Sequence, residues 1–218
     1  ERYPLEAYQT NVLGTLTLLN AAQRTGVEVF VNISTDKAAN PISVLGYSKR
    51  IAERVTAAAG QTAKSGKYMS VRFGNVLGSR GSVLMSFRDQ IAKGGPLTVT
   101  HRAVTRYFMT ISEAVQLVIQ AGAIGRSGEA LDLDMGTPVS IYDVAKQLVA
   151  NSGKPVEIEI VGLRAGEKVH EELFGDGEVD TRPRHPLISH VPVLPVDLGL
   201  LTPSPTDARE TMLRIIAN

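Results

Sequence analysis

Apolar residues recur at helical spacing in two stretches of the first third of the chain. From Leu5 to Arg24 they fall on one side of a helix, and a second helix is predicted from Val44 to Lys64, where an alanine run joins the apolar positions. Gly26 stands where a glycine commonly ends a helix. The first third therefore contains two amphipathic helices.

Short runs rich in β-branched residues come before and after the second helix. Val27–Ile33 and Tyr68–Phe73 are predicted strands, and the polar loops Ser34–Ser43 and Gly74–Ser82 follow them directly. Strand, loop, helix and strand at this spacing form a βαβ unit, which implies a parallel sheet. Ligands bind at the carboxyl ends of such strands, so both loops are candidate binding segments.

The second half of the chain mixes shorter elements. The patterns predict helices at Ile111–Gly122, Ser140–Asn151 and Thr206–Ile216, strands at Ala130–Asp134 and Glu157–Val161, and irregular structure from Gly175 onward, apart from the last helix. We expect an α/β protein: a partial Rossmann-type parallel sheet with a smaller C-terminal substrate lobe. Residues 1–83 would carry the sheet and a catalytic loop. Residues 84–218 would form mostly the lobe, with some segments returning to the sheet.

Composition narrows the classes of protein. With 23 Lys and Arg against 22 Asp and Glu, nothing indicates nucleic-acid binding. The lack of cysteine excludes disulfides, cysteine-ligated zinc and a thiol nucleophile, and the four histidines lack metal-ligand spacing, so no metal is predicted. No apolar run approaches the ~18 residues that cross a membrane. The prediction is a cytoplasmic protein, and a membrane-associated parent is compatible with it.

The strongest candidate chemistry lies at the end of the first predicted strand. Thr35, Asp36 and Lys37 place a hydroxyl, a carboxyl and an amine in succession, and Lys49 follows in the first turns of the next helix. This set offers a hydrogen-bond donor, an acid, a base and a cation at one sheet edge. The alternative is a solvated polar loop before a lysine-rich helix start, which is common for such charge patterns.

Polar residues elsewhere are candidates for substrate contacts. Asn75 and Arg80 lie in the glycine-rich loop after the second strand, where they would bind phosphate or sugar, or would only serve the turn. Arg106 is either a phosphate contact or a surface cation. Arg164 and Glu167 could form a surface ion pair.

Five segments resemble one family. Ser34-Thr-Asp-Lys-Ala-Ala-Asn-Pro41, followed by Gly46-Tyr-Ser-Lys-Arg50, resembles the active-site signature of UDP-N-acetylglucosamine 4,6-dehydratases and the related capsular polysaccharide biosynthesis proteins. These belong to the extended short-chain dehydrogenase/reductase family. The segments Thr10–Thr15, Arg72–Val83, Thr105–Thr110 and Gly162–Lys168 resemble further family motifs, in the family's order. Only the last ~35 residues fall outside the resemblance.

The resemblance implies an enzyme of nucleotide-sugar and surface-polysaccharide biosynthesis. In that family NAD⁺ takes a hydride from C4 of a UDP-sugar, a base removes the C5 proton, an acid protonates the leaving C6 hydroxyl, and the hydride returns to C6. By resemblance Asp36 is the acid and Lys37 the base, while Thr35 hydrogen-bonds the C4 oxygen. Lys49 would contact the nicotinamide ribose and help the C4 hydroxyl to lose its proton.

The resemblance also assigns binding residues. Ser34 and Asn75 would lie on the cofactor side, and Asn75, Arg80 and Arg106 would contact substrate. Arg164 would face the diphosphate and Glu167 the ribose hydroxyls of the nucleotide. Relatives dimerise through helices equivalent to the first two predicted here, so we also expect a homo-oligomer.

The chain departs from the wider family at Leu45. The usual pattern there is Tyr-x-x-x-Lys, whose tyrosine is the general base at C4, and leucine cannot ionise. Tyr47 lies two residues further on, about 200° around a helix. Another acceptor is therefore required for the C4 proton: Lys49, Asp36 or water.

No strand followed by Gly-x-x-Gly-x-x-Gly and a helix, the arrangement that holds the dinucleotide pyrophosphate, is predicted. We therefore expect a fragment whose NAD site is incomplete and which is inactive when isolated. Two alternatives remain: a nucleotide-sugar 4-epimerase or reductase, which would not need the Asp36–Lys37 pair, and a non-catalytic dinucleotide-binding scaffold, which Leu45 favours.

Overall fold

A computed structural model describes residues 1–79 and 81–218. These residues form two compact units. Unit 1 comprises Glu1–Phe73, Gln116–Asp134 and Glu172–Asn218, and unit 2 comprises Gly74–Val115 and Met135–Glu171.

Unit 1 contains a four-stranded sheet in the order β1-β2-β7-β10. The strands are β1 (Val29–Ile33), β2 (Lys67–Arg72), β7 (Glu129–Leu133) and β10 (Ile188–Pro192). β1, β2 and β7 run parallel, and β10 is antiparallel to β7. The predicted α/β class with a Rossmann-type parallel sheet is confirmed.

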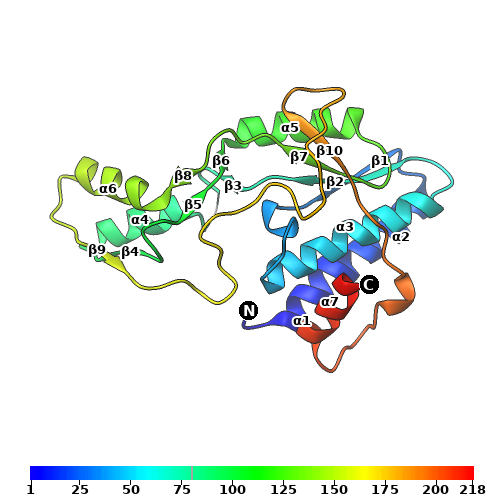
Figure 1. Ribbon diagram of the computed structural model, residues 1–218, viewed down its shortest axis with the longest axis horizontal. Helices are drawn as coiled ribbons and strands as arrows, with labels where there is room; N and C mark the ends of the chain where they lie inside the picture. Colours follow the sequence, from blue (N-terminus) through cyan, green and yellow to red (C-terminus); the bar gives the residue numbers. More distant parts are fainter. Residues whose placement is uncertain (80) are drawn as a thin grey trace. The chain divides into compact units, whose positions relative to one another are not determined.

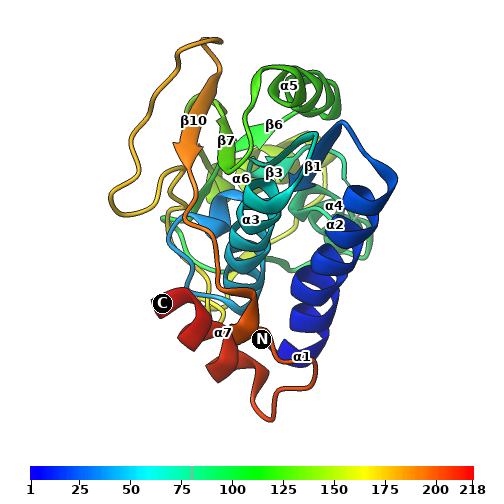
Figure 2. The same cartoon turned by 90° about the vertical axis from the view of Figure 1, so that its right-hand side faces the viewer.

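Helices cover both faces of this sheet (Figures 1 and 2). One face carries α3 (Val44–Thr62), with α2 (Gly14–Thr25) and α7 (Ala208–Ala217) packed against it, and the Gln116–Ile124 part of α5 (Ile111–Ile124) covers the other. α1 (Pro4–Ala7) runs through a π-helical turn at Tyr8–Leu13 into α2. The core between α3 and its neighbours includes Tyr8, Ile51, Val55, Tyr68 and Met212, all fully buried. The predicted helices end within a few residues of those observed.

The expectation of irregular structure after Gly175 is wrong for β10. Residues Ile188–Val191 are buried, and the two polar ones among them have partners. The Ser189 hydroxyl accepts from the Thr181 amide at 2.9 Å, and His190 Nδ1 bonds Glu129 at 2.9 Å. Because prolines flank the strand and polar residues interrupt its apolar run, the local pattern did not indicate it.

Unit 2 is built from short pairings around its own core. Parallel pairs join β3 (Asn75–Val76) to β6 (Phe108–Met109) and β4 (Leu97–Val99) to β9 (Ile158–Ile160), and β5 (Thr105–Arg106) is antiparallel to β8 (Val139–Ser140). Helices α4 (Val83–Ala92) and α6 (Ile141–Ser152) pack on them around Phe87, Leu97 and Ile141. Helix α4 was not among the helices predicted from the sequence. No helix among the described residues has both the length and the apolar character needed to cross a bilayer.

Candidate active site

The predicted catalytic loop begins where β1 ends. The amide of Ser34 donates to the Val71 carbonyl at 2.7 Å, so the pairing with β2 extends one residue beyond the strand. The chain then makes a 3₁₀ turn over Asp36–Ala38, at whose start the Thr35 hydroxyl accepts from the Lys37 amide. Sheet pairing and the turn together fix the backbone that carries the candidate acid and base.

Asp36 lies at the centre of this loop and is 1% exposed. Its Oδ1 accepts from the Thr35 hydroxyl at 2.8 Å and from Lys37 Nζ at 2.9 Å. Its Oδ2 is buried, and no described residue donates to it. Buried polar atoms are almost always bonded, so this oxygen is suited to accept a hydrogen bond from a ligand hydroxyl. Because its carboxyl group is buried, Asp36 does not fit the alternative of a solvated polar loop.

Lys49 reaches the same strand end from the second turn of α3. Its Nζ donates to the carbonyl of Ile33, the last residue of β1, at 3.0 Å. Burial lowers the pKa of Lys49, and the negative charge of Glu53 opposes that shift. The structure thus joins Thr35, Asp36 and Lys37 in one hydrogen-bonded set and places Lys49 at the strand end from which they extend.

The start of α3 also settles the question of Tyr47. Its side chain is 8% exposed and belongs to the apolar core, whereas Leu45 is 47% exposed. Tyr47 therefore cannot take the place of a tyrosine at position 45. Gly46 brings the helix close to the loop, since a Cβ there would stand 2.5 Å from the Lys37 carbonyl oxygen.

A buried ion-pair network lies beside the loop in unit 1, and sequence reasoning missed it. Arg72, the last residue of β2, is fully buried and bonds three carboxylates. Its Nε and Nη2 donate to Glu53 at 2.8 and 2.7 Å, and its Nη1 donates to Glu178 at 2.6 Å and Asp132 at 3.3 Å. The Ser34 hydroxyl donates to Glu53 Oε1 at 2.6 Å, which connects the network to the catalytic loop.

The pKa values of two carboxyl groups in this network are shifted in opposite directions. Burial raises the pKa of Asp132 well above its ordinary value. For Glu178 burial acts in the same direction, but the bonds from Arg72 outweigh it and lower the pKa to about 2. Arg50 adds a second guanidinium group to this network, because its Nη1 donates to Glu178 at 2.8 Å and to Glu53 at 3.3 Å.

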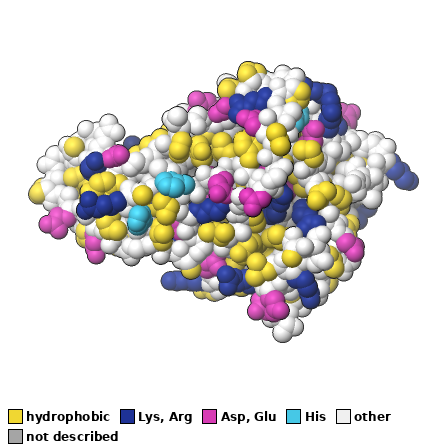
Figure 3. Space-filling model, in the orientation of Figure 1, with side chains coloured by type: hydrophobic (Ala, Val, Ile, Leu, Met, Phe, Trp, Pro, Cys, Tyr) yellow, Lys and Arg dark blue, Asp and Glu magenta, His cyan; other side chains and the backbone are white. Residues whose placement is uncertain are grey.

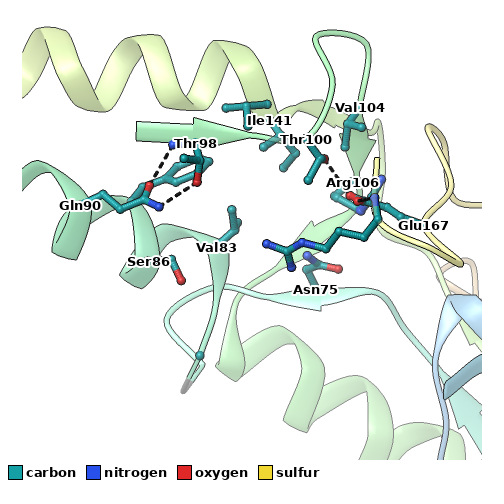
Figure 4. Close-up of a pocket in the computed structure, with 14 residues that line it drawn as sticks. Asn75, Val83, Ser86, Gln90, Thr98, Thr100, Val104, Arg106, Ile141 and Glu167 are labelled. Atoms are coloured by element: carbon teal, nitrogen blue, oxygen red, sulfur yellow. Dashed lines mark hydrogen bonds and ion pairs between the residues drawn. The ribbon is translucent and has the colours of Figure 1, made fainter. Parts of the chain in front are cut away.

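Unit 2 contains a pocket of about 310 Å³ that gathers most of the predicted substrate residues (Figure 4). Asn75, Arg106, Arg164 and Glu167 all line it. Arg80 lies outside the described residues. Sequence reasoning missed four further polar lining residues, for which no local motif gave a signal: Ser86, Gln90, Thr98 and Thr100.

Hydrogen bonds fix two sides of this pocket. On one side Glu167 Oε1 accepts from Arg106 Nη2 and from the Thr100 hydroxyl, both at 2.9 Å. On the other the Gln90 amide donates to the Thr98 hydroxyl at 2.8 Å and accepts from the Thr98 amide at 3.1 Å (Figure 4). Arg164 is exposed and lines the same pocket, so its guanidinium is accessible to an anion.

The face of the molecule drawn in Figure 3 shows no large patch of a single charge sign. Lys and Arg side chains are interspersed there with Asp and Glu, as the nearly balanced composition leads one to expect.

The Gly-x-x-Gly-x-x-Gly spacing does occur once, at Gly122, Gly125 and Gly128, which the sequence analysis overlooked. There the run begins at Gly122 in the last turn of helix α5 and leads into strand β7, the reverse of the order in a dinucleotide-binding turn. A Cβ at Gly125 would overlap the Met69 sulfur and stand 2.8 Å from a Leu131 methyl carbon. Gly125 allows close packing, Gly128 has a positive φ, and the run is not a phosphate-binding loop.

Comparison with known families decides the class of protein. Residues 1–192 match the model of the family described as "Polysaccharide biosynthesis protein". The chain belongs to this family. The predicted family, of the extended short-chain dehydrogenase/reductase type, is confirmed.

Named relatives cover most of this chain. It is 51% identical over 191 residues to "Probable polysaccharide biosynthesis protein EpsC" of Bacillus subtilis (strain 168), with 86% of this chain and 32% of that protein aligned. It is 52% identical over 182 residues to "Capsular polysaccharide biosynthesis protein CapD" of Staphylococcus aureus, covering 82% and 30%. The "UDP-glucose 4-epimerase" of Rickettsia akari is 38% identical over 182 residues, covering 82% and 53%. The chain thus spans about a third of the length of the first two relatives.

Solved structures agree on the fold. The X-ray structure of Pen from Bacillus thuringiensis has a TM-score of 0.81 at 30% identity, covering all of this chain and 71% of that one. DesIV, a dTDP-glucose 4,6-dehydratase from Streptomyces venezuelae solved with NAD and TYD bound, has a TM-score of 0.71 at 23% identity, covering 80% and 61%. Relatives and neighbours therefore include both epimerases and dehydratases.

Proposed function

We propose that the chain carries the acid–base centre and nucleotide pocket of a UDP-N-acetylhexosamine 4,6-dehydratase that acts in surface-polysaccharide synthesis. The observation that supports it most is the Thr35–Asp36–Lys37 set, with a buried carboxylate bonded to an adjacent hydroxyl and amine. Elimination of water across C5 and C6 requires a base that removes the C5 proton and an acid that protonates the hydroxyl on C6. Asp36 and Lys37 supply both from consecutive positions.

In this mechanism Lys37 removes the C5 proton and Asp36 protonates the departing C6 hydroxyl. Asp36 Oδ2 is the oxygen assigned to that proton, because Oδ1 is already bonded to Thr35 and Lys37. The Thr35 hydroxyl donates to the C4 oxygen once substrate displaces its bond to Asp36. Water or Lys49 accepts the C4 proton, since Leu45 cannot.

The donor set fits the nicotinamide end of NAD in part. Lys49 uses one of its three N–H donors on the Ile33 carbonyl, which leaves two for ribose hydroxyls. Ser34, assigned to the cofactor side by resemblance, already donates its hydroxyl to Glu53. NAD supplies hydride acceptance and return when bound. The pyrophosphate cradle would have to come from residues beyond the printed sequence.

The pocket in unit 2 is assigned to the nucleotide. Arg164 would bind the diphosphate, and Glu167, fixed by Arg106 and Thr100, would accept from ribose hydroxyls. The cavity volume of about 310 Å³ lies in the range of small-ligand sites.

The alternative is a nucleotide-sugar 4-epimerase, which the name of the Rickettsia akari relative favours. An epimerase returns the hydride to C4 and needs no proton transfer at C5. The consecutive acid and base would then have no role in the reaction, and this argues for the dehydratase.

The test uses the natural full-length protein with UDP-N-acetylglucosamine in deuterated water. A dehydratase gives a product that has lost water and carries deuterium at C5. A product of unchanged mass with an inverted C4 and no deuterium at C5 would establish the epimerase instead. The printed chain by itself should give neither product, because its described residues form no glycine-rich turn that would hold the pyrophosphate.

A further inference from the structure

One short segment of unit 1 contacts both the buried network and the end of the catalytic loop. This is the 172–178 segment, which follows the last residues of unit 2 along the chain. It supplies Glu178 to Arg72 and Arg50, and Glu172 and Asp176 to Asn40. None of these residues is needed to bind or transform substrate in the function proposed above.

The first contact reaches the catalytic loop through two intermediates. Glu178 bonds Nη1 and Nη2 of Arg72 at 2.6 and 3.0 Å, and Arg72 in turn bonds both oxygens of Glu53. Glu53 accepts from the hydroxyl of Ser34, the residue directly before Thr35. Loss of the Glu178 charge leaves Arg72 with a weaker set of acceptors, and a buried guanidinium depends on its partners for its position.

The second contact fixes the loop directly at its other end. Asn40 Nδ2 donates to Glu172 at 2.6 Å and to Asp176 at 3.2 Å, and the Asp176 amide donates back to Asn40 Oδ1 at 2.9 Å. Between these bonds a Cβ at Gly175 would stand 2.5 Å from the Ala39 carbonyl oxygen. The segment therefore lies flat against the loop, and only glycine permits this approach.

We propose that Glu178 and Asn40 are positioning residues for the catalytic loop, and that the 172–178 segment holds Thr35–Asp36–Lys37 in its reactive geometry from both ends. The effect of this restraint on turnover rests on the proposed dehydratase function. The restraint on the loop itself does not depend on that function. The loop spans only five residues between Ser34 and Asn40, so restraint at both ends leaves its backbone little freedom.

The structural part is tested on the printed chain by amide hydrogen exchange. Asn40→Ala removes the direct bonds without leaving a buried charge, and Glu178→Gln weakens the network with little change in side-chain volume. Each should speed exchange at the amides of Asp36, Ala38 and Ala39 by about ten- to a hundredfold. Should Glu178→Gln fail to fold, Asn40→Ala alone decides the result.

The matched control is Glu129→Gln. It weakens a carboxylate bond to His190 at the other end of β7, away from the strand ends that carry the loop. Exchange in the loop should stay at the wild-type rate. Loop exchange that is unchanged in Asn40→Ala, or equally fast in the control, would overturn the proposal.

The catalytic part is tested in the natural full-length protein. Both variants should lower kcat by about tenfold or more while KM for the UDP-sugar stays within about twofold, because the pocket in unit 2 is untouched. A variant that only destabilised the fold would lose active protein without changing turnover per folded molecule. If the wild type has no dehydratase activity but the loop exchanges faster in the variants, the proposed function fails and the positioning role stands.

Discussion

The strand end of unit 1 and the pocket of unit 2 hold their polar groups by different means. In unit 1, Asp36, Glu53 and Arg72 are almost completely buried. Asp36 is bonded by its neighbours Thr35 and Lys37, whereas Glu53 of α3 and Arg72 of β2 bond each other. In unit 2, the pocket is lined by helix α4, by short strands of two or three residues and by the exposed 161–166 stretch that carries Arg164. Proton transfer depends on geometry to a fraction of an ångström, whereas a flexible diphosphate tolerates adjustable contacts.

This contrast predicts that substitutions in unit 1 change rate or stability and those in unit 2 change affinity. The largest effect is expected for Lys37→Ala in the natural full-length protein. Loss of the base should lower turnover by about 10²–10⁴-fold and abolish deuterium incorporation at C5 while bound NAD is retained. Lys64→Ala, at an exposed position after α3, is the control. Normal turnover in Lys37→Ala would rule out the dehydratase mechanism.

The next effect concerns stability rather than chemistry. Arg72→Met should leave the carboxylates of Glu53 and Glu178 buried without their main partner, at a cost of about 3–5 kcal/mol in the free energy of unfolding. Urea denaturation of the printed chain measures this. Arg24→Met, at an exposed position near the end of α2, should change the same quantity by less than about 1 kcal/mol. Equal stabilities would show that the network is not structurally important.

A smaller effect is expected in unit 2. Arg164→Ala should weaken UDP binding to the printed chain by about ten- to a hundredfold, the usual effect of losing a charge-assisted bond to phosphate. Isothermal titration calorimetry with UDP measures it, and the exposed Arg102→Ala serves as the control. Unchanged UDP affinity would show that Arg164 does not bind the nucleotide. The roles proposed for residues of unit 1 would not be affected.

The smallest effect is the contribution of Glu178 to the pH dependence of stability. Its pKa is about 2 in the folded chain against an ordinary 4.5, so its ionised form stabilises the fold above pH 4.5. That contribution is lost as the pH falls from 4.5 toward about 2. Unfolding measured across this range should vary less in Glu178→Gln than in the wild type. Glu159→Gln, at an exposed position in β9, should follow the wild-type curve.

The local patterns in the sequence predicted strands β1, β2 and β7 of the unit 1 sheet, and the helices packed on that sheet, well. Runs such as Val29–Ile33 combine β-branched residues with a polar loop at the strand end, so both the strand and the Asp36–Lys37 site were accessible to sequence reasoning. β10 was not, because its buried Ser189 and His190 depend on partners elsewhere in the chain. The network was missed for the same reason: Arg72 is 19 residues from Glu53 and 106 from Glu178.

Gly125 shows how tightly the layers of unit 1 are spaced. A methyl group at this position would meet the Met69 sulfur, the Leu131 side chain and, at 2.9 Å, the Ala121 carbonyl oxygen of the preceding helical turn, so both side chains would have to move. Met69 and Leu131 belong to β2 and β7, the strands that end at Arg72 and near Asp132. A side chain at this position would force Met69 and Leu131 to repack, so a redesign of this chain would keep glycine there.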